Sequence, residues 1–129
     1  NHGPGSSYDK IDEVVNAVKN HDPHIGACVD TGHFIRSGED PIEAIKRLGS
    51  RVFALHIKDE EKQEKKSRNV IIGKGFLDVP KLFATLKEIN FPVDGSISLE
   101  YEANPKNPID DIQQCLSVAE EAIIESKNR

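Results

Sequence analysis

Apolar residues recur along the chain in two patterns, helical spacing and short continuous runs. Apolar positions three or four residues apart predict an amphipathic helix over about residues 7–20, with Ser6 or Ser7 as its N-cap. The same spacing predicts three more helices, at about residues 41–48, 80–89 and 109–125. The predicted helices at about residues 41–48 and 80–89 have a proline in their first turn, where its missing N–H costs nothing.

Three continuous apolar runs, at residues 24–30, 51–57 and 96–102, predict strands that are buried on both faces, as in a parallel sheet. Strands that alternate with helices indicate right-handed crossovers and an α/β fold. Three strands cannot close a barrel, which takes eight strand–helix units and about 250 residues. We therefore expect the sheet to be completed elsewhere, or its open edges to be covered by homo-oligomerisation.

Polar side chains gather where the predicted strands end. Asp30, His56 and Glu100 end the three strands in turn, and His33 and Lys58 lie close behind the first two. In parallel α/β folds this carboxyl edge of the sheet is where sites are built. Two carboxylates and one imidazole suit one divalent metal ion such as Mn, Mg, Co or Zn. An ion held with open positions can polarise a carbonyl or bind adjacent hydroxyls.

Each of these residues also has an ordinary structural interpretation. Asp30 could cap the turn that follows it, and His33 could be a capping or core histidine. His56 could point into a core, and Glu100 could be a surface carboxylate at a strand end. The placement of all of them on successive strand ends is what favours a common site.

Further polar residues have competing interpretations as well. Lys58 could form a plain ion pair with Asp59, and Glu102 shares a strand face with Glu100 because strand side chains alternate. His21 and His24 flank a turn between a helix and a strand, and we interpret them as surface residues.

Composition narrows the class of protein. The net charge is −5 and the pI is near 5.5, which disfavours a nucleic-acid partner, and the basic run at residues 62–68 fits a solvated loop. With 30% charged residues, a mean hydropathy of −0.51 and no long apolar stretch, we expect a soluble cytoplasmic protein without a membrane span. Cys28 and Cys115 fall in apolar patterns and predict buried thiols.

The segment Gly73–Lys74–Gly75 is too short for a phosphate-binding loop, because the Gly-x-x-x-x-Gly-Lys-Ser/Thr pattern is missing and no helix starts after the lysine. Its glycines predict a backbone that turns closely beside the rim of the site.

Four segments together resemble the xylose isomerase-like TIM-barrel superfamily, and its sugar phosphate isomerase/epimerase branch in particular. They are Val29-Asp30-Thr31-Gly32-His33, Leu55-His56-Ile57-Lys58-Asp59, Gly73-Lys74-Gly75 with Asp78 after it, and Ile97-Ser98-Leu99-Glu100. The resemblance covers nearly the whole chain. It implies that residues 1–129 are the C-terminal portion of a (β/α)8 barrel, about strands 6–8 with their flanking helices.

The resemblance implies a metal-dependent isomerase or epimerase that moves a proton through an enediolate of a small carbohydrate substrate. Asp30, His56 and Glu100 would be metal ligands, with Glu100 also a catalytic base. His33 resembles the family's substrate-contacting histidine, and we place Lys58 and His2 with it as candidate substrate contacts. The family's fourth ligand and second base would directly precede Asn1, so we expect this polypeptide alone to be inactive or to bind metal weakly.

Three alternatives stay open. Dehydratases of the inosose or dehydroshikimate type use much the same ligands, and a half barrel could be a non-catalytic module that self-associates through its sheet edges. An AP endonuclease-like protein would carry an Asp-Arg-His triplet at residues 66–69, where this chain has Lys-Ser-Arg-Asn.

Overall fold

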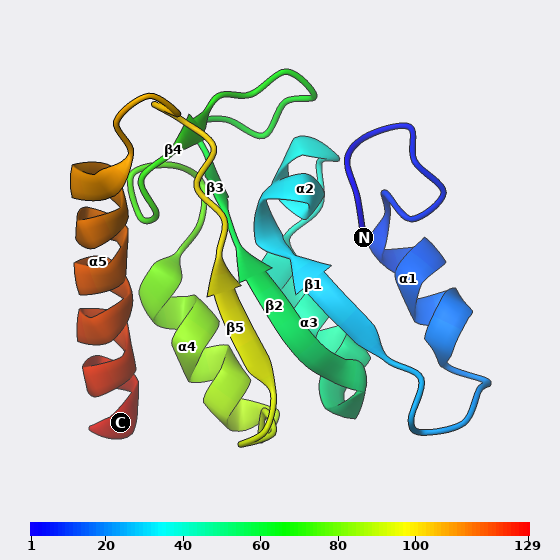
Figure 1. The fold of residues 1–129 in the computed structure, drawn as a ribbon. Helices are drawn as coiled ribbons and strands as arrows, with labels where there is room; N and C mark the ends of the chain where they lie inside the picture. The colour runs from blue at the N-terminus through cyan, green and yellow to red at the C-terminus, as the bar shows by residue number, and fades with distance from the viewer.

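Three parallel strands form the central sheet of this computed structural model, which describes residues 1–129. They are β1 (Ala27–Asp30), β2 (Val52–Ile57) and β5 (Ser96–Leu99), in the order β1-β2-β5 (Figure 1). The register places Asp30 beside His56, and His56 beside Ser98. The expected α/β arrangement with a parallel sheet is confirmed, and the sheet is open rather than a closed barrel.

Helices and short elements connect these strands. The helices are α1 (Ile11–Val18), α2 (Thr31–Arg36), α3 (Pro41–Leu48), α4 (Val79–Glu88) and α5 (Ile109–Lys127), with a 3-10 turn η1 at Gly49–Arg51. A two-stranded antiparallel pair joins β3 (Asp59–Glu60) to β4 (Asn69–Val70). Asp40 and Asp78 cap α3 and α4, which both have proline in the first turn. No helix has the length and apolar character that a bilayer crossing demands.

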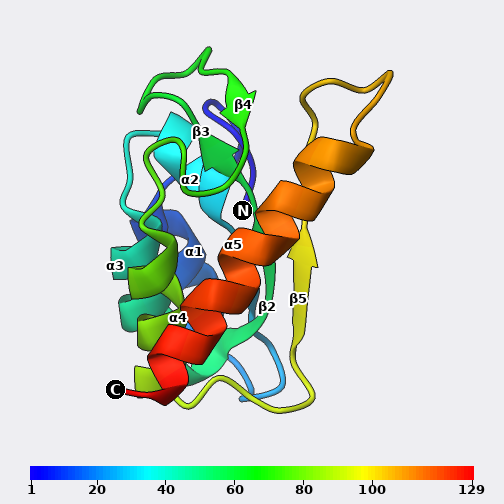
Figure 2. The same cartoon turned by 90° about the vertical axis from the view of Figure 1, so that its left-hand side faces the viewer.

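The core lies on one side of the sheet. Figure 2 shows the helices on one face of β2 and β5, with the other face uncovered. Val29, Leu55 and Ile57 point to the helices and are buried, whereas Cys28 on the alternate face is exposed. The prediction of burial on both faces is therefore wrong, and so is that of a buried Cys28. Cys115 is buried in α5, as expected.

The elements differ from the sequence prediction mainly near the chain's turns. The first helix begins at Ile11 instead of residue 7, because Asp9 accepts a hydrogen bond from the Gly5 N–H and holds residues 5–9 in a turn. The short α2 and the β3–β4 pair were not predicted, since neither contains a full apolar period. His21 and His24 are exposed, as expected.

Candidate metal and active site

The three candidate ligands meet at the carboxyl ends of the strands. The His56 Nδ1 atom lies 3.2 Å from Glu100 Oε1 and 3.8 Å from Asp30 Oδ2, and one ligand atom from each residue lies within 4.8 Å of the others. The pairing of β1 with β2 brings Asp30 beside His56. Glu100 reaches them because its N–H bonds to the Ile57 carbonyl, which extends the β2–β5 ladder by one step.

This spacing fits a single cation. Ligand atoms at about 2.1 Å from a central ion are separated by about 3.0–3.5 Å when they occupy neighbouring positions around it. The two separations from His56 Nδ1, 3.2 Å to Glu100 Oε1 and 3.8 Å to Asp30 Oδ2, are close to that range. The carboxylates of Asp30 and Glu100 supply the negative charge that a divalent ion requires.

The two carboxylate oxygens of Asp30 have different contacts. Oδ1 accepts the His33 N–H at 2.9 Å and caps α2, while Oδ2 faces the His56 ring. The Asn1 side chain fixes the backbone at this point, bonding the Asp30 N–H at 2.8 Å and the Asp30 carbonyl at 3.0 Å. The capping interpretation of Asp30 is thus confirmed. The cap uses Oδ1, so Oδ2 is free to bind a cation.

Lys58 points at the candidate base instead of open solvent. Its ammonium lies 3.0 Å from Glu100 Oε2 and also hydrogen-bonds Glu102, with only 4% of the side chain exposed. Burial opposes the charge, but the hydrogen bonds to Glu102 and Glu100 outweigh burial and raise the pKa of Lys58. The Lys58–Asp59 ion pair does not form. Lys58 therefore holds Glu100 with one oxygen turned toward His56.

Gly32 makes room for this lysine. A Cβ atom at Gly32 would lie 2.4 Å from Lys58 Cγ and 2.7 Å from Cδ, closer than side-chain atoms can approach. The first turn of α2 therefore packs directly on the lysine stem.

Replacing Gly32 with alanine is expected to destabilise the fold by about 1–3 kcal/mol, the usual cost of forcing a methyl group into a packed site. Urea unfolding of Gly32→Ala, with and without Lys58→Ala, measures this effect. The penalty should fall in the Lys58→Ala background, where the closest atoms, Cγ and Cδ, are gone and Lys58 Cβ at 2.9 Å remains. An equal penalty in both backgrounds would contradict the packing described here.

His33 occupies the inner wall of the site. It is buried on α2, its ring stacks on His2 with centroids 4.3 Å apart, and its Nε2 lies 4.0 Å from Asp30 Oδ2. Burial lowers the pKa of His33, and the nearby charges of Lys58, His2 and Arg36 act in the same direction, against the opposite pull of Asp30. Of the three candidate substrate contacts, His33 thus contacts Asp30 and Lys58 contacts Glu100, whereas the exposed His2 stacks on His33.

Asp59 organises the loop beside the site, a role that sequence reasoning missed. Its two carboxylate oxygens accept backbone N–H groups from Glu60, Gly73, Gly75 and Leu77 at 2.8–3.0 Å. Burial raises the pKa of Asp59, while these amide donors lower it. The expected close turn at the glycines is confirmed, because a Cβ at Gly75 would lie 2.2 Å from the Glu60 carbonyl oxygen and Gly73 has φ +85°. The two closely spaced glycines were the available signal.

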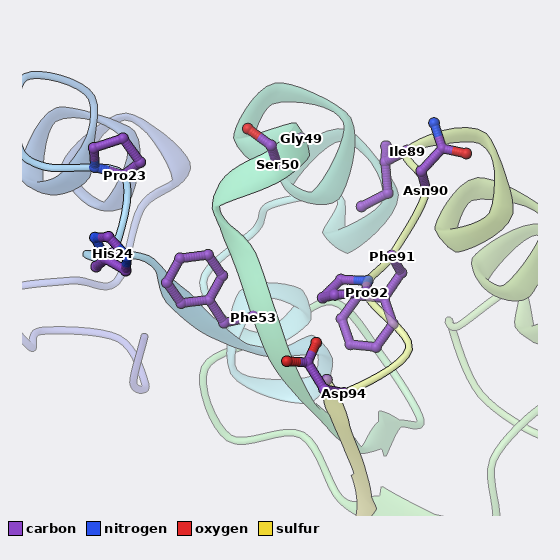
Figure 3. Close-up of a pocket in the computed structure, with 11 residues that line it drawn as sticks. Pro23, His24, Gly49, Ser50, Phe53, Ile89, Asn90, Phe91, Pro92 and Asp94 are labelled. Atoms are coloured by element: carbon purple, nitrogen blue, oxygen red, sulfur yellow. The ribbon is translucent and has the colours of Figure 1, made fainter.

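Two hollows lie at opposite ends of the sheet. One of about 360 Å³ lies at the carboxyl ends and is lined by His33, Arg36, Lys58, Glu60 and Glu102 together with residues of the adjoining loops. A larger one of about 750 Å³ lies at the amino ends of the strands, where Figure 3 shows the Phe53 and Phe91 rings at its walls. Of these two, the smaller hollow is the one that includes Lys58, which contacts Glu100, and His33, which contacts Asp30.

Parallel strands, each followed by a helix and each ending near a ligand-type side chain, make this an α/β protein of the kind that builds its sites at the carboxyl edge of the sheet, as TIM barrels do. The chain belongs to the xylose isomerase-like TIM barrel family, whose pattern matches residues 1–121.

Relatives of known name agree with this family. The chain is 29% identical over 128 residues to an inosose dehydratase of Mesomycoplasma hyopneumoniae (strain 7448). This alignment covers 84% of this chain and 42% of the dehydratase. Its fold is similar to a xylose isomerase domain protein from Planctomyces limnophilus, with TM-score 0.75 and 20% identity over 96% of this chain and 45% of the other. It is also similar to an IOLI protein crystallised with a zinc atom, with TM-score 0.62 and 25% identity. This match covers 88% of this chain and 41% of the IOLI chain. The chain thus spans less than half the length of each of these proteins.

Proposed function

We propose that Asp30, His56 and Glu100 are ligands of one divalent metal ion in an isomerase or epimerase that acts on a sugar or sugar phosphate. The observation that carries this proposal is the convergence of their three ligand atoms within 4.8 Å at the carboxyl ends of neighbouring strands. The zinc atom in the similar IOLI structure supports a metal ion in a protein of this fold. When bound, the ion would draw electron density from the substrate carbonyl and make the neighbouring C–H more acidic.

The chain's own residues would move the proton. Glu100 would take a proton from the carbon next to the carbonyl, giving an enediolate, and the proton would return to a different carbon or face. Lys58 orients Glu100 by binding its second oxygen at 3.0 Å. His33, with His2 stacked on it, would contact the substrate from the wall formed by α2.

A dehydratase is the second candidate, favoured by the name of the related inosose dehydratase. The first step would be the same removal of a proton next to a ketone. The two reactions differ afterwards, because a dehydratase expels the hydroxyl from the next carbon as water, whereas an isomerase returns a proton. The cluster at residues 30, 56 and 100 serves the shared step, so the products must distinguish the two reactions.

The metal site predicts a specific binding defect. Asp30→Asn and His56→Ala should each weaken binding of Zn²⁺ or Mn²⁺ by about 100-fold or more, since the first removes a charged ligand oxygen and the second removes the imidazole. Isothermal titration calorimetry on the protein that carries this chain measures the change. His24→Ala, which removes an exposed histidine far from the cluster, should bind metal as the unchanged protein does. Equal affinities for all four proteins would refute the metal site.

The reaction class is tested by products. A panel of ketoses, ketose phosphates and inososes is incubated with the metal-loaded protein in deuterated water and followed by NMR. An isomerase or epimerase yields an isomer of equal composition with deuterium on carbon, while a dehydratase yields a product that has lost water. Turnover without exchange of any C–H proton would sink both versions of the proposal.

A further inference from the structure

Arg36 makes an unusual contact with the histidine in the wall of the site. Its Nη1 lies 3.1 Å from His33 Nδ1. Guanidinium carries five N–H donors and no acceptor, and it remains charged at every accessible pH. A hydrogen bond between this pair therefore requires a lone pair on Nδ1, so a neutral ring must carry its proton on Nε2. Histidines at metal sites usually have the opposite arrangement, with a carboxylate or carbonyl accepting from the outer nitrogen.

The surroundings hold this pair in place on several sides. The Arg36 Nε donates to the Lys65 carbonyl at 3.1 Å, and the His2 ring stacks on His33. Gly3 is buried against the pair, where an added Cβ would lie 3.0 Å from Arg36 Nη1 and 3.4 Å from His33 Nδ1. The pair has little room to separate or rotate.

The other ring nitrogen faces the reaction site. His33 Nε2 lies 4.0 Å from Asp30 Oδ2, too far for a hydrogen bond, and has no other hydrogen-bond partner in the chain. The ring also lines the smaller hollow, together with Lys58, whose ammonium contacts Glu100. A proton on Nε2 would thus be available to an oxygen atom of a molecule held there.

We propose that Arg36 is a positioning residue that fixes His33 in the Nε2–H form, so that His33 serves as a neutral hydrogen-bond donor to an oxygen of the bound substrate. This inference rests on the proposed function for the identity of that oxygen, which is a carbonyl or hydroxyl oxygen next to the carbon that loses its proton. A donor there stabilises the negative charge that develops on oxygen as the proton leaves. The arrangement excludes His33 as the base, in keeping with a carboxylate such as Glu100 in that role.

The tautomer is directly measurable by nuclear magnetic resonance. Long-range ¹H–¹⁵N correlation spectra of the ¹⁵N-histidine-labelled protein, with His33 assigned through His33→Gln, report the protonation of each ring nitrogen. We expect an unprotonated Nδ1 and a protonated Nε2 for His33. In Arg36→Met the signals should move toward a mixture of the two tautomers, and in Arg36→Lys, which retains a donor, they should stay closer to the original. Arg68→Met removes an arginine whose guanidinium bonds Glu61, and it should leave the His33 signals unchanged.

Kinetics provide the second readout. Arg36→Met should lower kcat by about 10–100-fold with metal affinity retained, as expected for a donor that acts on developing charge, and Arg36→Lys should restore part of the loss. A protonated Nδ1 in the unchanged protein would overturn the proposal even if no Arg36 variant folds, and so would an unaltered His33 spectrum in Arg36→Met. Loss of the metal site would instead appear in the calorimetry, with the tautomer intact.

Discussion

Glu100→Gln is expected to reduce turnover by about 10²–10⁴-fold at saturating metal, the usual contribution of a positioned general base. Glutamine keeps the shape of the side chain but cannot accept a proton from carbon. It also leaves the Lys58 ammonium, 3.0 Å away, without one of its two carboxylates. Deuterium incorporation into the substrate under single-turnover conditions measures the proton-transfer step separately from product release.

Glu102→Gln is the matched control for this experiment. Glu102 also binds Lys58, but its side chain is 67% exposed and lies outside the cluster of Asp30, His56 and Glu100. The bond to Lys58 lowers the pKa of Glu102, and losing that charge should cost less than about tenfold in rate, since exposed pairs contribute little. If Glu100→Gln exchanges substrate protons within tenfold of the unchanged protein, Glu100 is not the base.

Much of the fold follows from periodicity alone. The strands β1, β2 and β5 were predictable because short apolar runs that alternate with helical patterns are typical of parallel strands, although one face of this sheet is uncovered. The helices α3 and α4 were predictable because Asp40 and Asp78 precede a proline in the first turn. Which face of the sheet is covered was not predictable, because alternation sets which residues share a face and not what packs on it, as the exposed Cys28 shows.

The site was predictable in its members more than in its contacts. Strand ends gave Asp30, His56 and Glu100 from position alone, and parallel register then brings them together. The contact of Arg36 with His33 could not be deduced, because it depends on a helix of only six residues, too short to show a helical pattern of apolar positions. The function of Asp59 was hidden for a similar reason, since its partners lie 14–18 residues away and are backbone amides.

The second large effect concerns that buried carboxylate. Asp59→Ala should destabilise the protein by about 3–5 kcal/mol, because it removes the acceptor for four backbone N–H groups in a buried, charge-assisted network. Asp59 is fully buried, and its bonds to the glycine loop lie between two residues of that loop, Ile72 and Leu77, whose side chains are in the core. Urea unfolding should show a lower midpoint with an unchanged slope. Glu61→Ala, two residues away on the exposed side, should change stability by less than about 0.5 kcal/mol.

Hydrogen exchange locates the same effect along the chain. In Asp59→Ala the amides of Gly73, Gly75 and Leu77 should lose protection together, because all three donate to the same carboxylate. Amides of β2 should exchange with only the global loss of stability. Since Lys58 adjoins Asp59 in sequence and binds Glu100, loosening this loop should also weaken metal binding. Retained protection at the two glycines would mean that the loop is held by contacts other than Asp59, and the link from this carboxylate to the metal cluster would fail.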